Sequence, residues 1–168
     1  MSNRQRRATL QAQADEQARL DAIAAPRHVD AELHFRGVGF ALLRLAALHS
    51  FRPAVLWEIY DRADGLVATV SRGTEPGNPY VAGQTALDSN PAVLRALLDE
   101  LADRRLTLAP AKAEVMTLDG ARFIAIVNVG EASCRLTWVD GNVPPGWLGV
   151  VAHLLRIHKY LASLGAAA

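Results

Sequence analysis

Two Asp-Gly dipeptides, at residues 64–65 and 119–120, each interrupt a run of β-forming residues. Asp-Gly suits a two-residue hairpin turn, because both central positions then need a positive φ that these residues tolerate. A helix start follows each hairpin at nearly the same distance, 26 residues from Gly65 to Pro91 and 25 from Gly120 to Pro145. The repeat predicts an α+β fold built from two hairpin-helix units.

The first 26 residues are predicted to form an N-terminal helical arm. Residues 2–25 are rich in Ala, Gln, Arg and Leu, which are good helix formers, and Pro26 ends the helix. Its apolar positions are mostly alanine, so the arm can bury little surface. The remaining residues, 27–168, are enough for a single α+β domain with a sizeable core.

The domain is predicted to hold an antiparallel sheet of five to six strands, packed by helices mainly on one face. Alternating or β-branched segments mark the strands. They are residues 29–35, 55–60, 66–71, 114–118, 122–129 and 134–139, with a short edge strand at 80–81. The rest of 73–90 is rich in Gly, Pro and Asn, and is predicted to be mostly loop.

Three apolar stripes at helical spacing predict the helices of the domain. The first covers residues 40–49, although Phe40-Ala-Leu-Leu43 also fits a buried strand. The second begins at Pro91, with Ser89 or Asn90 as its N-cap. The third covers 145–164. The stripes of the last two are Leu94, Leu97, Leu98 and Leu101, and Trp147, Val150, Val151, Leu154, Ile157 and Leu161.

Composition indicates a globular protein without a nucleic-acid or membrane partner. Of 168 residues, 51% are hydrophobic and 21% charged, and the net charge of +1 lacks the basic surplus of a DNA-binding protein. The N-terminus has no apolar signal-peptide core, and the most apolar window, 37–48, is too short to span a membrane. One cysteine, Cys134, fits a reducing compartment, so we expect a cytoplasmic location.

The residues that could carry catalysis or bind a metal do not form a recognisable pattern. His153 and His158 are five residues apart on one helix, and a pair of metal ligands would be three or four apart. We expect His153 at the boundary between core and surface, and His158 at the surface. Cys134 alternates with Leu136 and Trp138, which predicts a core-facing, unreactive thiol. The sequence thus predicts no catalytic residue, no metal site and no cofactor.

Carboxylates and tyrosines on the predicted polar faces and turns are the candidates for contact with a protein partner. The acidic residues cluster near the first hairpin and on the middle helix, where we expect solvent exposure. The candidate partner-binding residues are Glu58, Tyr60, Asp61, Asp64, Tyr80, Asp99, Glu100 and Asp103.

The Leu136-Thr-Trp138 strand, the Pro144-Pro-Gly-Trp147 helix start and the long last helix give the chain the layout of small α+β immunity proteins. This resemblance covers residues 55–164. It implies a non-enzymatic, protein-binding role in which the chain neutralises a partner toxin, and it transfers no functional residues.

Two alternatives remain open at the level of sequence. The order of elements is also similar to that of secretion chaperones, which dimerise and hold an unfolded effector segment. A third possibility is an enzyme or small-ligand carrier with a pocket between sheet and helices, for which Glu58, Tyr60 and His153 are the candidates. The chain is expected to be a monomer or a homodimer.

Overall fold

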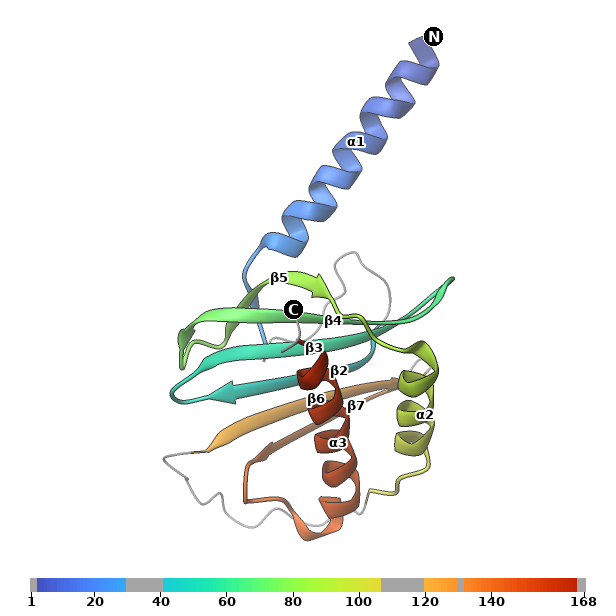
Figure 1. Ribbon diagram of the computed structural model, residues 1–168. Coiled ribbons are helices and arrows are strands. Elements are labelled where there is room, and N and C mark those ends of the chain that lie inside the picture. The colour runs from blue at the N-terminus through green and yellow to red at the C-terminus, as the bar shows by residue number, and fades with distance from the viewer. Residues whose placement is uncertain (1–2, 30–40, 107–119, 130–131, 166–168) are drawn as a thin grey trace.

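The computed structural model describes residues 3–29, 41–106, 120–129 and 132–165. Three α-helices, a short 3-10 helix and seven strands follow one another along this part of the chain (Figure 1). They are α1 (Asn3–Ala24), β1 (Arg27–His28), β2 (Ala41–His49), β3 (Pro53–Arg62), β4 (Gly65–Pro76), β5 (Tyr80–Ala86), α2 (Pro91–Ala102), β6 (Ala121–Val129), β7 (Ala132–Val139), η1 (Pro145–Trp147) and α3 (Leu148–Gly165).

The strands form one antiparallel sheet in the order β1-β5-β4-β3-β2-β6-β7. The α+β class and the antiparallel sheet are confirmed, whereas the expected five to six strands are in fact seven. Residues 73–90 are not mostly loop, because β4 continues to Pro76 and β5 begins at Tyr80. The backbone of β5 pairs with both β4 and β1, which compensates for its glycine and polar residues.

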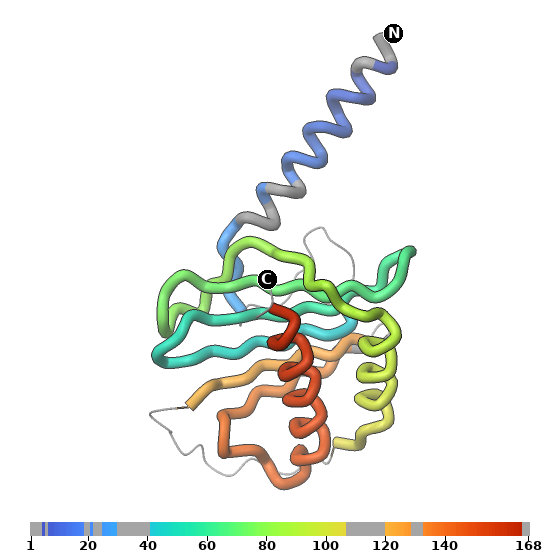
Figure 2. The backbone as a smooth tube through the Cα atoms, in the orientation of Figure 1, coloured from blue at the N-terminus to red at the C-terminus, as the bar shows by residue number. Residues whose placement is uncertain are grey.

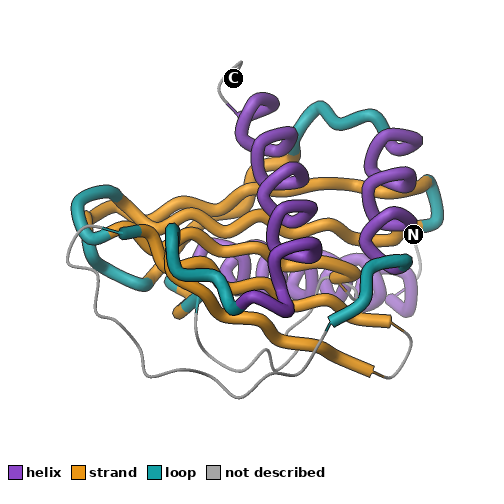
Figure 3. Tube along the Cα trace, turned by 90° about the horizontal axis from the view of Figure 1, so that it is seen from below, coloured by secondary structure: helices purple, strands orange, loops and turns teal. Residues whose placement is uncertain are grey.

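Helices α2 and α3 lie side by side on one face of the sheet (Figures 1 and 3). Their leucine stripes bury against side chains from β2, β3, β4, β6 and β7 to form the main core. The Asn90 side chain accepts a hydrogen bond from the Ala92 backbone, so Asn90 is the N-cap of α2 and Pro91 follows it, as predicted. The predicted buried stripe of the last helix includes Trp147. In the structure Trp147 is half-buried and lies in η1, just before α3.

The predicted helix over 40–49 is the main correction to the predicted elements, because its described residues, Ala41–His49, form the interior strand β2. The strand lies between β3 and β6 and, apart from Arg44, is apolar on both sides. Leu43, Leu45 and Ala47 face the helices, while Ala46 packs in a second hydrophobic cluster with Leu56 and Ile124. A strand buried on both faces gives a continuous apolar run, whose periodicity cannot distinguish strand from helix.

The first predicted hairpin exists, but its turn is shifted by one residue. Arg62 pairs with Gly65, so Ala63 and Asp64 form the turn between β3 and β4. Gly65 has a φ of 119°. Among the described residues, only glycines have a positive φ. The glycine alone therefore provides the left-handed conformation, and Asp64 does not.

The second unit is confirmed in part. Strands 122–129 and 134–139 are found within β6 and β7, which pair with each other and lead to α3. The predicted strand 114–118 and the Asp119 turn position lie outside the described residues, as do residues 30–35 of the first predicted strand. The one described residue of that predicted strand, Val29, lies in a turn directly after β1.

The N-terminal helix α1 projects from the β5 side of the sheet and away from the other two helices (Figure 2). Each side chain from Arg7 to Ala18 is exposed. Hydrogen bonds within the helix join Gln11 to Asp15 and Gln17 to Asp21, each at 2.8 Å. The predicted helix over 2–25 is thus confirmed over its described length, and among its described side chains Leu10 is the only large apolar one.

Candidate functional site

A buried ionic cluster lies on the sheet face opposite α2 and α3. Five neighbouring strands each contribute to it: β1 provides Arg27, β5 provides Gln84, β4 provides Thr69 and Ser71, β3 provides Glu58 and Tyr60, and β2 provides Arg44. Side chains alternate between the two faces of a strand, so Leu56, Glu58 and Tyr60 share this face while Trp57 and Ile59 enter the main core.

Glu58 is the centre of the cluster and only 1% exposed. Its Oε2 accepts hydrogen bonds from the Arg27 guanidinium at 3.0 Å and from the Gln84 amide at 3.1 Å. Its Oε1 lies 2.9 Å from Nε of Arg44, an ion pair in which the N–H does not point at the oxygen. Both carboxylate oxygens are therefore held by side chains of the fold.

Hydrogen bonds extend the cluster toward both neighbours of Glu58. Arg27 donates to the Ser71 hydroxyl at 2.6 Å. The Gln84 amide lies 3.1 Å from the Tyr60 hydroxyl and 3.0 Å from that of Thr69. Burial raises the pKa of Tyr60, and the nearby charge of Glu58 raises it further, so the phenol stays protonated at neutral pH.

The cluster has two cations for one anion and therefore a formal charge of +1. Arg27 is about a third exposed and Arg44 about a tenth, so the excess charge is nearest to solvent at the β1 edge. Removing one partner from a buried ion pair leaves an uncompensated charge, which destabilises a fold strongly. The arrangement therefore favours one register of the five strands, and both carboxylate oxygens of Glu58 lie against side chains of the fold.

The cluster corrects the expectation that the polar side chains stay dispersed at solvent-facing positions. Glu58 and Tyr60 are buried and lie together, whereas we expected a solvated polar face. The signal was present in the sequence: Arg44 interrupts an apolar run, and it lies directly opposite Glu58 in the β2–β3 register. Opposite charges at facing positions are a common cross-strand pair, but the pair is visible only once 40–49 is assigned as a strand.

His153 lies on the other face of the sheet, away from Glu58 and Tyr60. It is buried between the helices, and its Nε2 donates to the Leu97 carbonyl of α2 at 2.8 Å. Glu100 lies 3.6 Å from its Nδ1 and pairs with Arg156 at 2.6 Å. The expected boundary position of His153 is therefore wrong, and the three candidate ligand-binding residues Glu58, Tyr60 and His153 do not form one site.

His158 is not the surface residue that the sequence predicted. It is half-buried, and its ring meets those of Trp57 and Phe123 edge-on, with centroids 4.7 Å and 5.7 Å apart. Phe123 in turn stacks on Trp138. Burial lowers the pKa of His158, and His49 lowers it further. This histidine thus belongs to an aromatic cluster beneath α3.

The other predicted partner-binding residues are distributed over separate elements. Asp64, Asp99 and Asp103 are exposed, and Tyr80 packs edge-on against His28. Asp61 pairs with Arg95 of α2 at 3.5 Å, and Glu100 is held by Arg156. Arginines are interspersed with these carboxylates, so the surface is mixed in charge. The basic residues are Arg62, Arg95, Arg104, Arg105 and Arg156.

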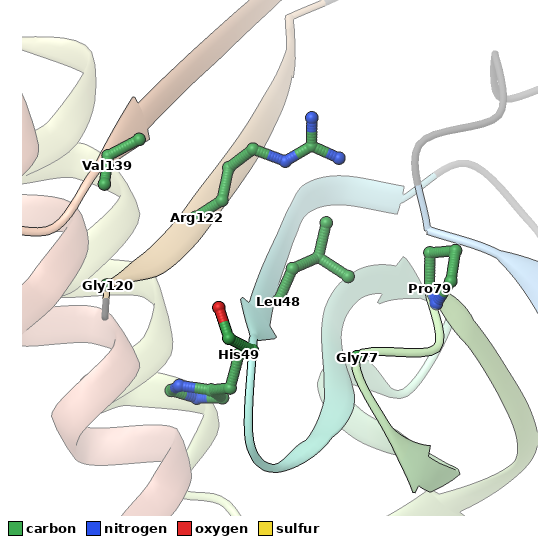
Figure 4. A pocket seen from close by; sticks show the side chains of 8 residues that line it. Leu48, His49, Gly77, Pro79, Gly120, Arg122 and Val139 are labelled. Carbon is green, nitrogen blue, oxygen red and sulfur yellow. The ribbon is translucent and has the colours of Figure 1, made fainter. Parts of the chain in front are cut away.

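A shallow pocket of about 350 Å³ opens at the edge of the sheet where β2, β4 and β7 end and β6 begins (Figure 4). Leu48 and Arg122, which face each other across β2 and β6, form one side, and Pro79 lies opposite. The His49 imidazole points away from Arg122, toward the helix side. The remaining lining residues are Ser50, Gly77, Gly120 and Val139, so no acid–base pair converges in this pocket.

The predicted core-facing position of Cys134 is wrong. Cys134 is exposed, whereas Leu136 and Trp138 on the same side of β7 are buried, because β7 is an edge strand and becomes exposed toward its start. Within the described ranges, no three His, Cys, Asp or Glu side chains are grouped as metal ligands. Among the described helices, none combines the length and apolar composition needed to cross a bilayer.

Comparison with protein-family models, with curated proteins and with solved structures finds no match to this chain.

Proposed function

We propose that this chain is a non-enzymatic, protein-binding module of the immunity type, which holds a partner such as a toxin and neutralises it. The observation that carries the proposal is the closed ionic cluster around Glu58. The polar groups that the fold brings together there bind one another across five strands. Their contribution is rigidity, and a rigid, preformed surface lowers the entropy cost of binding another folded protein.

The surface region that we assign to such a partner is the mixed surface that joins α2 to the β3–β4 turn through the Asp61–Arg95 pair. Exposed charges in a mixed pattern favour specificity and rapid association over high affinity. We therefore assign Asp99 and Asp103 to partner contact as part of this proposal.

The test combines the purified chain with an inactive form of the protein encoded by the neighbouring reading frame. A stoichiometric complex in native mass spectrometry supports the proposal, and titration calorimetry gives its affinity. Reversing two charges on α2, with Asp99→Lys and Asp103→Lys, should weaken the complex. The control pair Glu75→Lys and Asp140→Lys makes the same charge change at exposed positions elsewhere and should not. Recovery of the chain from its native host without a protein partner would contradict the proposal.

A second candidate is a chaperone that holds an unfolded secreted effector, and the order of elements favours it. A helix, the strands β2 to β5, a helix, two strands and a last helix follow one another, in the layout that resembles secretion chaperones. Hydrogen exchange of the bound partner separates the two candidates. A toxin neutralised in its folded form keeps its protected amides, whereas an effector segment held unfolded exchanges along its length.

A further inference from the structure

The exposed helix α1 carries its charges in the reverse of the order that suits a single helix. Arg4, Arg6 and Arg7 lie near its N-terminus, whereas its second half holds Asp15, Glu16 and Asp21 with a single arginine, Arg19, and is net negative. The first turn has no acidic residue and the last turn no basic one. Because the N-terminus of a helix is the positive end of its dipole, both ends of α1 are unfavourably charged in isolation.

One side of α1 combines these charges with the only large apolar side chain that is exposed on the helix among its described residues. At 100° per residue, Arg7, Leu10, Ala14, Ala18 and Asp21 fall within an arc of about 80°. All five are exposed, and Leu10 is 58% accessible. This side therefore runs from a cation through a short apolar centre to an anion.

We infer that two copies of this chain associate through α1 in an antiparallel pair. In the register that places Ala14 opposite Ala14, Arg7 of each copy faces Asp21 of the other, and Leu10 faces Ala18. The alanines let the two backbones approach closely, and the contact is self-complementary, as a two-fold axis requires. The arginines of each copy also lie beside the negative end of the partner helix.

The direction of α1 selects the antiparallel arrangement over a parallel one. The helix projects from the sheet along about 33 Å, so antiparallel pairing leaves the two sheets at opposite ends of the pair (Figure 1). Parallel pairing would bring both sheets to the same end and would set arginine against arginine and carboxylate against carboxylate. Since the paired surface is small and charged, association should weaken with salt.

Sedimentation velocity over a wide concentration range at low ionic strength tests this inference, with reductant present because Cys134 is exposed. The natural chain should form a dimer. Arg7→Glu or Asp21→Arg should each weaken association by about tenfold, because every substitution acts at two symmetry-related contacts. The double variant Arg7→Glu/Asp21→Arg should restore association, since it exchanges the two charges and keeps the net charge of the chain.

Tryptophan fluorescence shows that the variants remain folded, because all three tryptophans lie outside α1. A natural chain that stays monomeric at every concentration would overturn the inference. A double variant that associates no better than the single variants would do so as well, because it would show that Arg7 and Asp21 do not meet. The inference is independent of the proposed function, which is tested by complex formation with a different protein.

Discussion

Glu58 occupies the middle of a central strand, where an apolar side chain would also pack. Its burial is tolerated because Arg27, Arg44 and Gln84 approach it from three other strands. Such a cluster stabilises the fold chiefly because the loss of any one partner would leave a buried charge without its counter-charge. It also disfavours a shifted strand register, because a shift by one residue would move Glu58 into the apolar core beneath the helices.

We therefore predict that Glu58→Gln lowers the free energy of unfolding by about 2–3 kcal/mol. The amide keeps the shape of the side chain but leaves two guanidinium groups without a counter-charge. Urea denaturation followed by tryptophan fluorescence measures the change. The control Asp64→Asn neutralises an exposed carboxylate in the turn and should change stability by less than about 0.5 kcal/mol. Equal effects of the two substitutions would show that the cluster does not stabilise the sheet.

His158 gives a second prediction at the residue scale. Burial lowers its pKa, so the unfolded chain, with a histidine pKa near 6.5, binds the proton more readily than the folded protein. Stability should therefore be fully present above about pH 6.5 and should fall as the pH decreases below that value. Thermal unfolding from pH 8 to pH 5 measures this dependence.

The matched variant for this measurement is His158→Phe, which keeps an aromatic ring against Trp57 and Phe123 and cannot be protonated. The variant and the natural chain should differ least at pH 8, and the natural chain should lose more stability toward pH 5. Parallel curves for the two proteins would show that His158 is not responsible for the pH dependence.

At the scale of elements, a prediction was correct where several local sequence signals agree on one type of element. Residues 91–102 form a helix because a capping Asn90, Pro91 and a leucine stripe agree with one another. Residues 40–49 carry an apolar run interrupted only by Arg44, which fits a helix as well as a strand that is buried on both faces. Only pairing with β3 and β6 distinguishes the two, and such pairing joins residues far apart in the sequence.

In helix α3 the same Leu→Ala substitution can be compared at a buried and at an exposed position. Leu154 is fully buried against the sheet, whereas Leu148 is 58% exposed at the start of the same helix. Leu154→Ala should therefore lower the free energy of unfolding by about 2–5 kcal/mol, because it leaves a cavity in the core. Leu148→Ala should have little effect. Denaturant unfolding measures both, and similar losses would contradict the packing of α3 on the sheet.

At the scale of the whole molecule, the protein combines a body with two hydrophobic clusters and an arm with none. The body is held by the core beneath α2 and α3 on one face and by the Glu58 cluster on the other. Among the described side chains of α1 the only large apolar one is Leu10, and most helical stability in proteins comes from tertiary packing of an amphipathic face.

Hydrogen exchange should therefore separate these two parts. We predict that the amides of α1 exchange fastest among the three α-helices in dilute solution, and that those of β2 and β3 exchange slowest, near the rate set by global unfolding. Mass spectrometry of peptides from quenched samples measures the pattern. Protection of α1 in dilute solution equal to that of α3 would show that the arm is stabilised by the body.

The sequence by itself determined the α+β class, the helices α1, α2 and α3, and the strands β6 and β7, because these depend on signals between neighbours in the chain. The tertiary structure alone decided the seven-strand order of the described residues, the strand identity of Ala41–His49 and the position of the turn before Gly65. It also decided the site, since Arg27, Arg44, Glu58 and Gln84 come from four strands and meet only when those strands pair. The physical reason is that propensity and periodicity act locally, whereas burial and charge pairing depend on what lies across the sheet.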